Sequence, residues 1–125
     1  MEDLNLSAYM RTEERLEKGA EIALKNRLYV PGWSMYSNLK ESPYSVLKLI
    51  VIARVDNKAV GCGLITKEYR DEDDFCSVFV RRKYRRQGIG RAIYAQAKKS
   101  LRRKRDFDIS AVTDTQQKFW DKVLV

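Results

Sequence analysis

The chain has 125 residues and contains no histidine. Nucleophile systems that pair serine or cysteine with histidine are therefore excluded. Zinc sites built from cysteine and histidine are excluded for the same reason. Any general base must be a carboxylate, a lysine, a tyrosine or a chain of water molecules.

Cysteine is scarce, and long apolar runs are absent. Cys62 and Cys76 are too few for a disulfide scaffold, and we expect both to be buried, reduced thiols in a protein of the cytoplasm. No run of about 18 apolar residues exists, so no membrane span is expected. Residues 1–5 show no pattern of a secretory signal. These features predict one cytoplasmic domain over residues 1–125.

Acidic side chains are missing from one long stretch. The formal net charge is +8, and residues 81–105 carry twelve lysines and arginines without one aspartate or glutamate. An acidic run at residues 71–74 comes shortly before them. A basic cluster suits phosphate groups, either of a small ligand or of a nucleic acid. At residues 98–105 the same charge is equally typical of a solvated helix face.

Apolar residues recur at helical or strand-like spacing through most of the chain. Helices are predicted at residues 11–28, 88–103 and 114–122. Strands are predicted at residues 46–55, 59–66, 75–80 and 107–112. The first two strands are joined as a hairpin by a short turn at residues 56–58. The predicted order is therefore α, β, β, β, α, β, α, which is a mixed α/β (α+β) fold.

The most informative segment joins the third predicted strand to the second predicted helix. The strand end Val78 to Val80 runs into a basic turn, and Gly88 and Gly90 then open the helix. Glycine has no Cβ, so a phosphate can lie directly against its backbone. The first helical turn adds unpaired N–H groups and the positive end of the helix dipole. The segment therefore predicts a cradle for a pyrophosphate.

Two common phosphate motifs do not fit this segment. It has no glycine–lysine–serine or glycine–lysine–threonine sequence, and Ile93 stands where a dinucleotide fingerprint needs a third small residue. Residues 85–90 (Arg-Arg-Gln-Gly-Ile-Gly) instead resemble the coenzyme A motif Gln/Arg-x-x-Gly-x-Gly/Ala of the GNAT family of N-acetyltransferases. The resemblance covers about residues 10–122, and its specific part is residues 74–91.

The resemblance implies a GNAT fold, with a mostly antiparallel central sheet and flanking helices. It also implies acetyl-coenzyme A as cosubstrate, no metal, and a primary amine that attacks the thioester directly in a ternary complex. The acceptor would be a protein lysine, a protein N-terminus or a small amine. The pantetheine arm would pair with the strand end as an added strand. The residues implied in coenzyme A binding are Val78, Phe79, Val80, Arg85, Arg86, Gln87, Gly88, Ile89, Gly90 and Arg91.

Acetyl transfer needs a neutral amine, and a free ammonium has a pKa of about 10.4. Histone-acetylating members of the family carry a glutamate four residues before the position that matches Val78, and Asp74 stands there. The resemblance thus implies Asp74 as the general base, acting through a water molecule, with Asp73 and Glu72 as alternates. The acidic run could instead be a solvated turn, or it could attract a cationic acceptor.

The C-terminal part departs from the family pattern. Many members carry a Phe-Tyr pair whose tyrosine protonates the leaving thiolate, but this chain has Phe119 and Trp120. Candidate replacements are Tyr36, Tyr44 and Tyr69. Family members also usually continue past the last helix, so the chain resembles a short, C-terminally truncated member. Its acceptor side would be open, which suits a protein acceptor, or would be completed by a second subunit in a homodimer.

A second hypothesis is a basic module without catalytic activity, which binds nucleic acid or keeps only the coenzyme A site. Gly88 and Gly90 separate the two hypotheses. A basic helix needs no glycines to bind nucleic acid, whereas a pyrophosphate cradle does. The sequence therefore favours the acetyltransferase.

Overall fold

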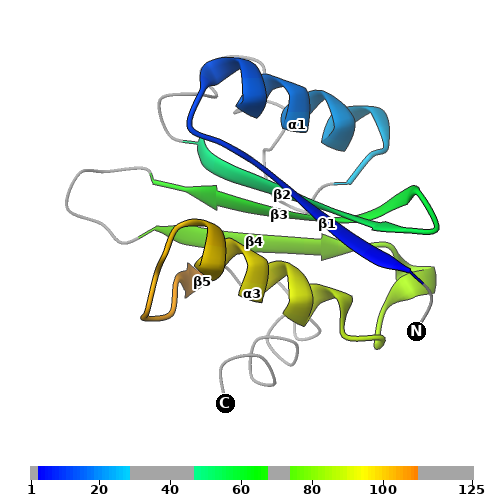
Figure 1. Ribbon diagram of the computed structural model, residues 1–125. Helices are drawn as coiled ribbons and strands as arrows, with labels where there is room; N and C mark the ends of the chain where they lie inside the picture. Colours follow the sequence, from blue (N-terminus) through cyan, green and yellow to red (C-terminus); the bar gives the residue numbers. More distant parts are fainter. Residues whose placement is uncertain (1–2, 29–46, 68–73, 110–125) are drawn as a thin grey trace.

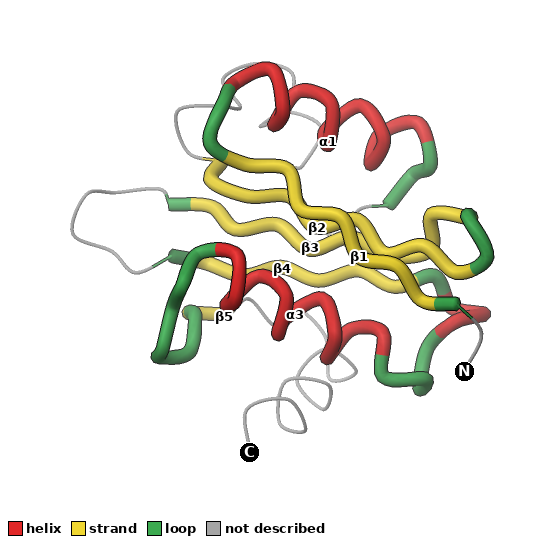
Figure 2. Tube along the Cα trace, in the orientation of Figure 1, coloured by secondary structure: helices red, strands yellow, loops and turns green. Residues whose placement is uncertain are grey.

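A five-stranded sheet lies between two helices (Figure 1; Figure 2). The computed structural model describes residues 3–28, 47–67 and 74–109. The strands are β1 (Leu4–Met10), β2 (Leu47–Val55), β3 (Lys58–Thr66), β4 (Phe75–Val80) and β5 (Asp108–Ile109). The helices are α1 (Glu13–Lys25) and α3 (Ile89–Ser100), and a short 3₁₀ turn, η1, spans Arg82–Tyr84. None of these helices is long and apolar enough to cross a membrane.

The strands follow one another across the sheet in sequence order, β1-β2-β3-β4-β5. The first four are antiparallel to their neighbours, and β5 is parallel to β4. The predicted mixed, mostly antiparallel fold class is confirmed. The predicted element order was incomplete, because strand β1 precedes the first helix. The predicted last helix, at residues 114–122, lies outside the described residues.

Strand β2 is buried on both faces, as its β-branched sequence predicts. Leu49 and Val51 belong to the core on the α3 side of the sheet. Ile50 and Ile52 belong to the core on the α1 side. Both α1 and α3 pack on β2, so this strand is the common floor of the two cores. Because helices cover both faces of the sheet, the connections at the ends of β4 are where a site can form.

A glycine lets α3 approach the sheet closely. A Cβ added to Gly63 of β3 would lie 2.3 Å from Ile93 Cγ2 of α3, a separation that real Cβ atoms do not show. Ile93 is itself fully buried. The missing side chain at Gly63 therefore lets Ile93 of α3 contact the backbone of β3. This contact sets the orientation that α3 takes after β4.

The β2–β3 turn has the form that the sequence predicts. Asp56 and Asn57 both adopt positive φ angles, 50° and 68°. Two such residues in a row are typical of the tight hairpin turn that matches the twist of its strands. Asparagine and aspartate tolerate this backbone better than other residues that carry a Cβ.

Both cysteines are buried free thiols. Burial raises the pKa of Cys62 to about 12 and raises that of Cys76 well above its ordinary value. Since the thiolate is the reactive form, we expect neither thiol of the native protein to react with iodoacetamide at neutral pH. Mass spectrometry should find both alkylated once denaturant is added. Fast alkylation of the native protein would show that these strands open more readily than their burial implies.

Candidate functional site

The connection from β4 to α3 holds two residues in a left-handed backbone conformation. Arg86 has a φ of 65°, and Gly88, the residue that caps the N-terminus of α3, has a φ of 80°. A side chain at Gly88 would be strained by this backbone, although a Cβ placed there meets no atom of the described residues within 4 Å, its chain neighbours and the helix's own nearby backbone aside. The glycine is therefore required by the turn, and the space beside it is open to a ligand.

The two helices of the described chain begin differently. At α1, the Thr12 side chain accepts a hydrogen bond from the Arg15 N–H, and Glu13 and Glu14 occupy the first turn. At α3, within the described residues, no side chain caps the helix and no acidic residue lies in the first turn. The free N–H groups and the dipole of α1 are thus balanced by its own side chains. The first N–H groups and the dipole of α3 are not balanced by side chains of the described residues, so they can bind an external anion such as a phosphate.

We call residues 86–91 the phosphate cradle. Arg86, Gln87 and Arg91 are exposed, whereas Ile89 and Gly90 are buried as the first turn of α3 packs on the sheet. Arg86 and Arg91 lie within three residues of Gly88, and their exposed side chains add positive charge near the start of the helix. The residues predicted to bind a pyrophosphate therefore form the turn before α3 and its first residues.

Two arginines next to the cradle also have structural contacts. Arg85 Nε donates to the Val80 carbonyl oxygen at 2.9 Å, which ties the start of the motif to the end of β4. Arg81 Nη2 donates to the Asn26 carbonyl oxygen at 2.7 Å, and its Nε donates to the Ala59 carbonyl oxygen at 3.3 Å. Arg81 therefore joins the end of α1 to the sheet. The sequence showed Arg81 only as a member of a basic cluster, and it predicted a coenzyme A-binding role for Arg85 without indicating this contact.

The backbone predicted to pair with the pantetheine arm, residues 78–80, follows the part of β4 that pairs with β5 in the described residues. On one side, β4 pairs with β3 from Phe75 to Val80. On the other side, β5 pairs with β4 at Phe75 and Cys76 in the described residues. Val78 and Val80 come after this pairing, and both side chains pack against the α3-side core. Their side chains thus serve the core, and among the described residues no strand pairs with the side of their backbone that faces away from β3.

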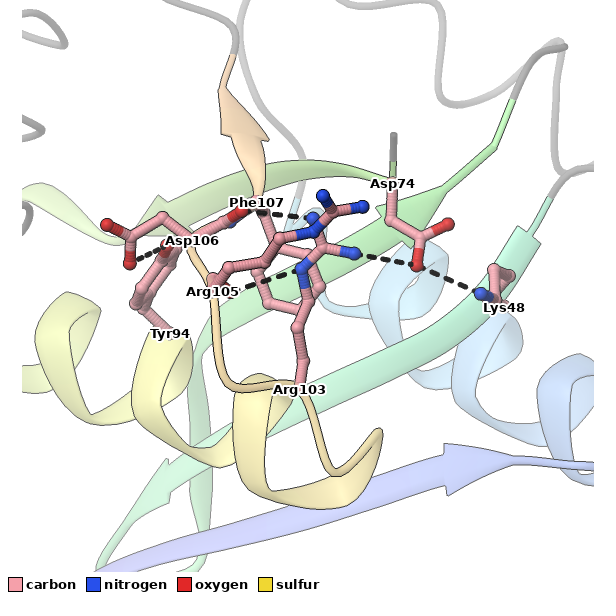
Figure 3. A network of polar contacts seen from close by, with 7 residues as sticks. All are labelled: Lys48, Asp74, Tyr94, Arg103, Arg105, Asp106 and Phe107. Carbon is pink, nitrogen blue, oxygen red and sulfur yellow. Dashed lines mark hydrogen bonds and ion pairs between the residues drawn. The ribbon is translucent and has the colours of Figure 1, made fainter. Parts of the chain in front are cut away.

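Asp74 lies immediately before β4 and is only 7% exposed. Its Oδ2 atom accepts from Lys48 Nζ at 2.9 Å and forms an ion pair with Arg103 Nη1 at 3.5 Å (Figure 3). The solvated-turn interpretation is therefore wrong for Asp74. The alternates Asp73 and Glu72 lie outside the described residues. Among described residues both partners bind Oδ2, so Oδ1 is the oxygen that would have to accept a substrate proton.

The partners of Asp74 could not be found from the sequence. Lys48 is 26 residues away and Arg103 is 29 residues away along the chain. No motif links them, and each looks like an ordinary exposed cation of a strand or a helix end. They meet because β2, β4 and β5 all start at the same end of the sheet, Lys48 lying in β2 and Arg103 in the connection that leads into β5.

Two open grooves flank α1 and stand apart from this site. One has a volume of about 410 Å³ and is lined by α1 and the β2–β3 hairpin. The other has a volume of about 690 Å³ and is lined by Tyr9 and residues 12–21. Neither includes a residue of β4 or α3. Within the described ranges no group of three or more metal-ligating side chains occurs.

The chain was compared with known proteins. The protein-family model described as "Acetyltransferase (GNAT) family" matches residues 12–122. No curated protein matches significantly. This search gave no nearer relative to guide the assignment of a substrate.

Several solved structures share the fold. A GNAT family acetyltransferase from Streptococcus pneumoniae has a TM-score of 0.64 at 16% identity, covering 98% of this chain and 87% of that chain. A ribosomal-protein-alanine N-acetyltransferase from Brucella melitensis has a TM-score of 0.59 at 15% identity, covering 97% and 90%. The aminoglycoside N-acetyltransferase AAC(6')-Iy, in complex with coenzyme A, has a TM-score of 0.51 at 18% identity, covering 97% and 85%. At these identities the likeness concerns the fold alone.

Proposed function

The chain belongs to the GNAT acetyltransferase family, and we propose that it transfers an acetyl group from acetyl-coenzyme A to a primary amine. The observation that carries this proposal is the uncapped start of α3, with the left-handed Gly88 before it and open space beside that glycine. Protein helices normally satisfy their first N–H groups with side chains, water or ligands. An anionic ligand at this helix start accounts for the missing cap.

The residues present fit coenzyme A. The N–H groups of the phosphate cradle would hold the pyrophosphate, and the exposed arginines Arg86 and Arg91 would add charge. The backbone of residues 78–80 would pair with the amide groups of the pantetheine arm. Gln87 and Ile89 would contribute backbone to the cradle, Arg85 ties the start of the motif to the end of β4, and Phe79 would contribute backbone to the strand edge while its side chain packs on the α1 side. These assignments remain proposals.

The reaction moves two protons off the amine nitrogen: the ammonium loses one before attack, and the nitrogen loses a second as the C–N bond forms, which protonates the departing thiolate. Acetyl-coenzyme A, when bound, supplies a thioester whose carbonyl carbon is attacked by the neutral amine, forming a C–N bond as the C–S bond breaks. We propose that Asp74 accepts the ammonium proton through Oδ1, directly or through a water molecule. Lys48 and Arg103 would hold the carboxylate in place by binding Oδ2. The family's usual acid position is Trp120, and the residues around it lie outside the described ranges.

The acceptor is the least constrained part of the proposal. Proteins that share the fold are named for a ribosomal-protein alanine and for aminoglycosides. The acceptor classes to test are a protein lysine, a protein N-terminus and a small amine such as an aminoglycoside. A cytoplasmic location, one domain over residues 1–125 and a homodimer also stay predictions from the sequence.

Acetyl-coenzyme A is expected to stabilise the protein against heat. At about 100 times the dissociation constant a ligand that binds only the native state adds about 2.7 kcal/mol to the free energy of unfolding. A thermal melt with and without acetyl-coenzyme A measures this gain, and ATP at the same concentration controls for binding of any phosphate. Equal stabilisation by ATP, or by duplex DNA at physiological salt, would favour the basic-module hypothesis instead. A screen of peptides, polyamines and cell lysate should then reveal the acetylated acceptor.

A further inference from the structure

The side of α3 that faces away from the sheet carries positive charge from its first turn to its last (Figure 1). The exposed positions of α3 are Arg91, Ala95 and Lys99. Residues four apart lie above one another on a helix, so these three form one stripe about 12 Å long. Arg102, just past the end of the helix, is also exposed. We call Arg91, Lys99 and Arg102 the basic face.

The segment around the basic face is rich in exposed cations. Of the twelve lysines and arginines in residues 81–105, ten are exposed. The two that are less exposed, Lys98 and Arg103, form ion pairs with Asp106 and Asp74. The exposed cations belong to one segment that contains no acidic residue. Their charges therefore add to a single positive field.

Helix α1 shows that an exposed helix face of this chain does not need charges of one sign. Its exposed residues mix acids with bases, and Glu14 and Glu21 each stand four residues before a lysine. That order and spacing favour ion pairs on a helix surface. Lys99 and Arg102 are instead like charges on neighbouring turns, which repel each other. Solvation alone does not explain why residues 81–105 lack acids, whereas binding of a polyanion does.

The composition of the stripe indicates which polyanion it fits. Arginine and lysine are the usual contacts of nucleic acid phosphates. The apolar member of the stripe is Ala95, whose methyl group is small. Protein interfaces depend on large buried anchors, often aromatic, and helices that lie on a membrane insert large apolar side chains. The stripe offers neither, so its charge complements a nucleic acid better than a protein or a bilayer.

We propose that the basic face is a second binding surface, which holds a nucleic acid by its phosphate backbone and is separate from the phosphate cradle. Contacts to phosphates carry no sequence information, so the surface does not select a base sequence. Lys99 stands about 12 Å along the helix from Arg91, which also belongs to the cradle. A nucleic acid can therefore bind through Lys99 and Arg102 while coenzyme A occupies the cradle.

The experiment measures the fluorescence anisotropy of a labelled short RNA duplex, and of a DNA duplex of the same sequence, as the protein is added. Both should bind, because both carry the same phosphates. Each phosphate contact contributes about −0.9 to the slope of log affinity against log salt, so three cations predict a slope of about −3. Between about 50 and about 150 mM salt the affinity should fall about 30-fold.

Three variants locate the surface. Lys99→Gln/Arg102→Gln should bind at least about tenfold more weakly at low salt, with a slope shallower by about 2. Ala95→Glu places an acid in the middle of the stripe and should also weaken binding. Lys18→Gln/Lys25→Gln removes the same charge from the exposed side of α1 and should bind as the wild-type protein does. Thermal melts first establish that every variant is folded.

The contrary results are equally definite. An equal loss in the α1 variant would show that net charge, and not the basic face, attracts the nucleic acid. Complete displacement by saturating acetyl-coenzyme A would mean that the nucleic acid occupies the phosphate cradle, and it would overturn a separate surface. Equal affinity for polyglutamate, or for vesicles that contain phosphatidylserine, would overturn the assignment to nucleic acid. The affinity of Lys99→Gln/Arg102→Gln for acetyl-coenzyme A should stay that of the wild-type protein.

Discussion

Replacing Gly88 with glutamate is expected to abolish binding of acetyl-coenzyme A while the protein remains folded. A Cβ at this position meets no atom of the described part of the chain within 4 Å, its chain neighbours and the helix's own nearby backbone aside, and this space is the volume proposed for the pyrophosphate. Its carboxylate would also repel the phosphates. The left-handed backbone would cost on the order of 1–2 kcal/mol, which is less than the usual stability of a domain of about 5–15 kcal/mol. Calorimetric titration of the folded variant gives the result.

Two further variants separate the steric effect of a side chain at Gly88 from the effect of its negative charge. Gly88→Asn adds a side chain without charge at a residue type that tolerates the left-handed conformation, and it should weaken binding less than glutamate does. Ala95→Glu adds the same charge on the exposed face of α3, away from the cradle, and should leave binding intact. Unchanged affinity for acetyl-coenzyme A in folded Gly88→Glu would show that the phosphate cradle does not hold the pyrophosphate.

Asp74→Asn is expected to lower kcat by about 100-fold or more, the usual contribution of a general base. Asparagine keeps the shape of the side chain and can still accept hydrogen bonds from Lys48 and Arg103, but it cannot take up the ammonium proton. A base acts in the transition state, so its loss should change kcat more than the KM for the acceptor. Steady-state kinetics at saturating acetyl-coenzyme A measure both parameters.

Arg103→Met is the comparison that makes this result specific. It breaks the same ion pair but leaves the carboxylate, so at saturating acetyl-coenzyme A it should retain most of the wild-type kcat. Asp73→Asn tests whether the neighbouring carboxylate acts instead, and the double Asp73/Asp74 variant tests whether one replaces the other. Full turnover in both Asp74→Asn and the double variant would mean that a desolvating pocket, and not Asp74, makes the amine neutral.

The central strands and α3 were predictable because their patterns are strong. The β-branched run of β2 reflects burial on both faces, and the apolar stripe of α3 meets the core at Ile89, Ile93 and Ala97. Strand β1 was missed although Leu4, Leu6, Ala8 and Met10 alternate along it. An edge strand that is only partly buried carries weaker apolar residues, and Asn5 and Ser7 between them are typical of loops. Its pairing with β2 overrides these local preferences.

The candidate site was predictable to the extent that it depends on backbone. The sequence predicted Gly88 for the close approach of a phosphate, and the structure gives a second reason for a glycine there, because its φ of 80° is a left-handed conformation. The environment of Asp74 could not be predicted, because ion pairs between distant segments leave no local signal. Burial of a carboxylate depends on which cations the fold brings to it. The family motif located Asp74 in the sequence, but the role of its carboxylate depends on contacts with Lys48 and Arg103 that no motif contains.

The most direct test of the account maps the ligand onto the backbone. In a nuclear magnetic resonance titration of the isotope-labelled protein with acetyl-coenzyme A, the account predicts that the largest amide shift changes fall in residues 86–91. Smaller changes should follow along residues 78–80, and all should saturate with one dissociation constant. Largest changes along α1 and its two grooves, or no saturable change in residues 86–91, would contradict the central claim that the start of α3 holds the pyrophosphate of coenzyme A.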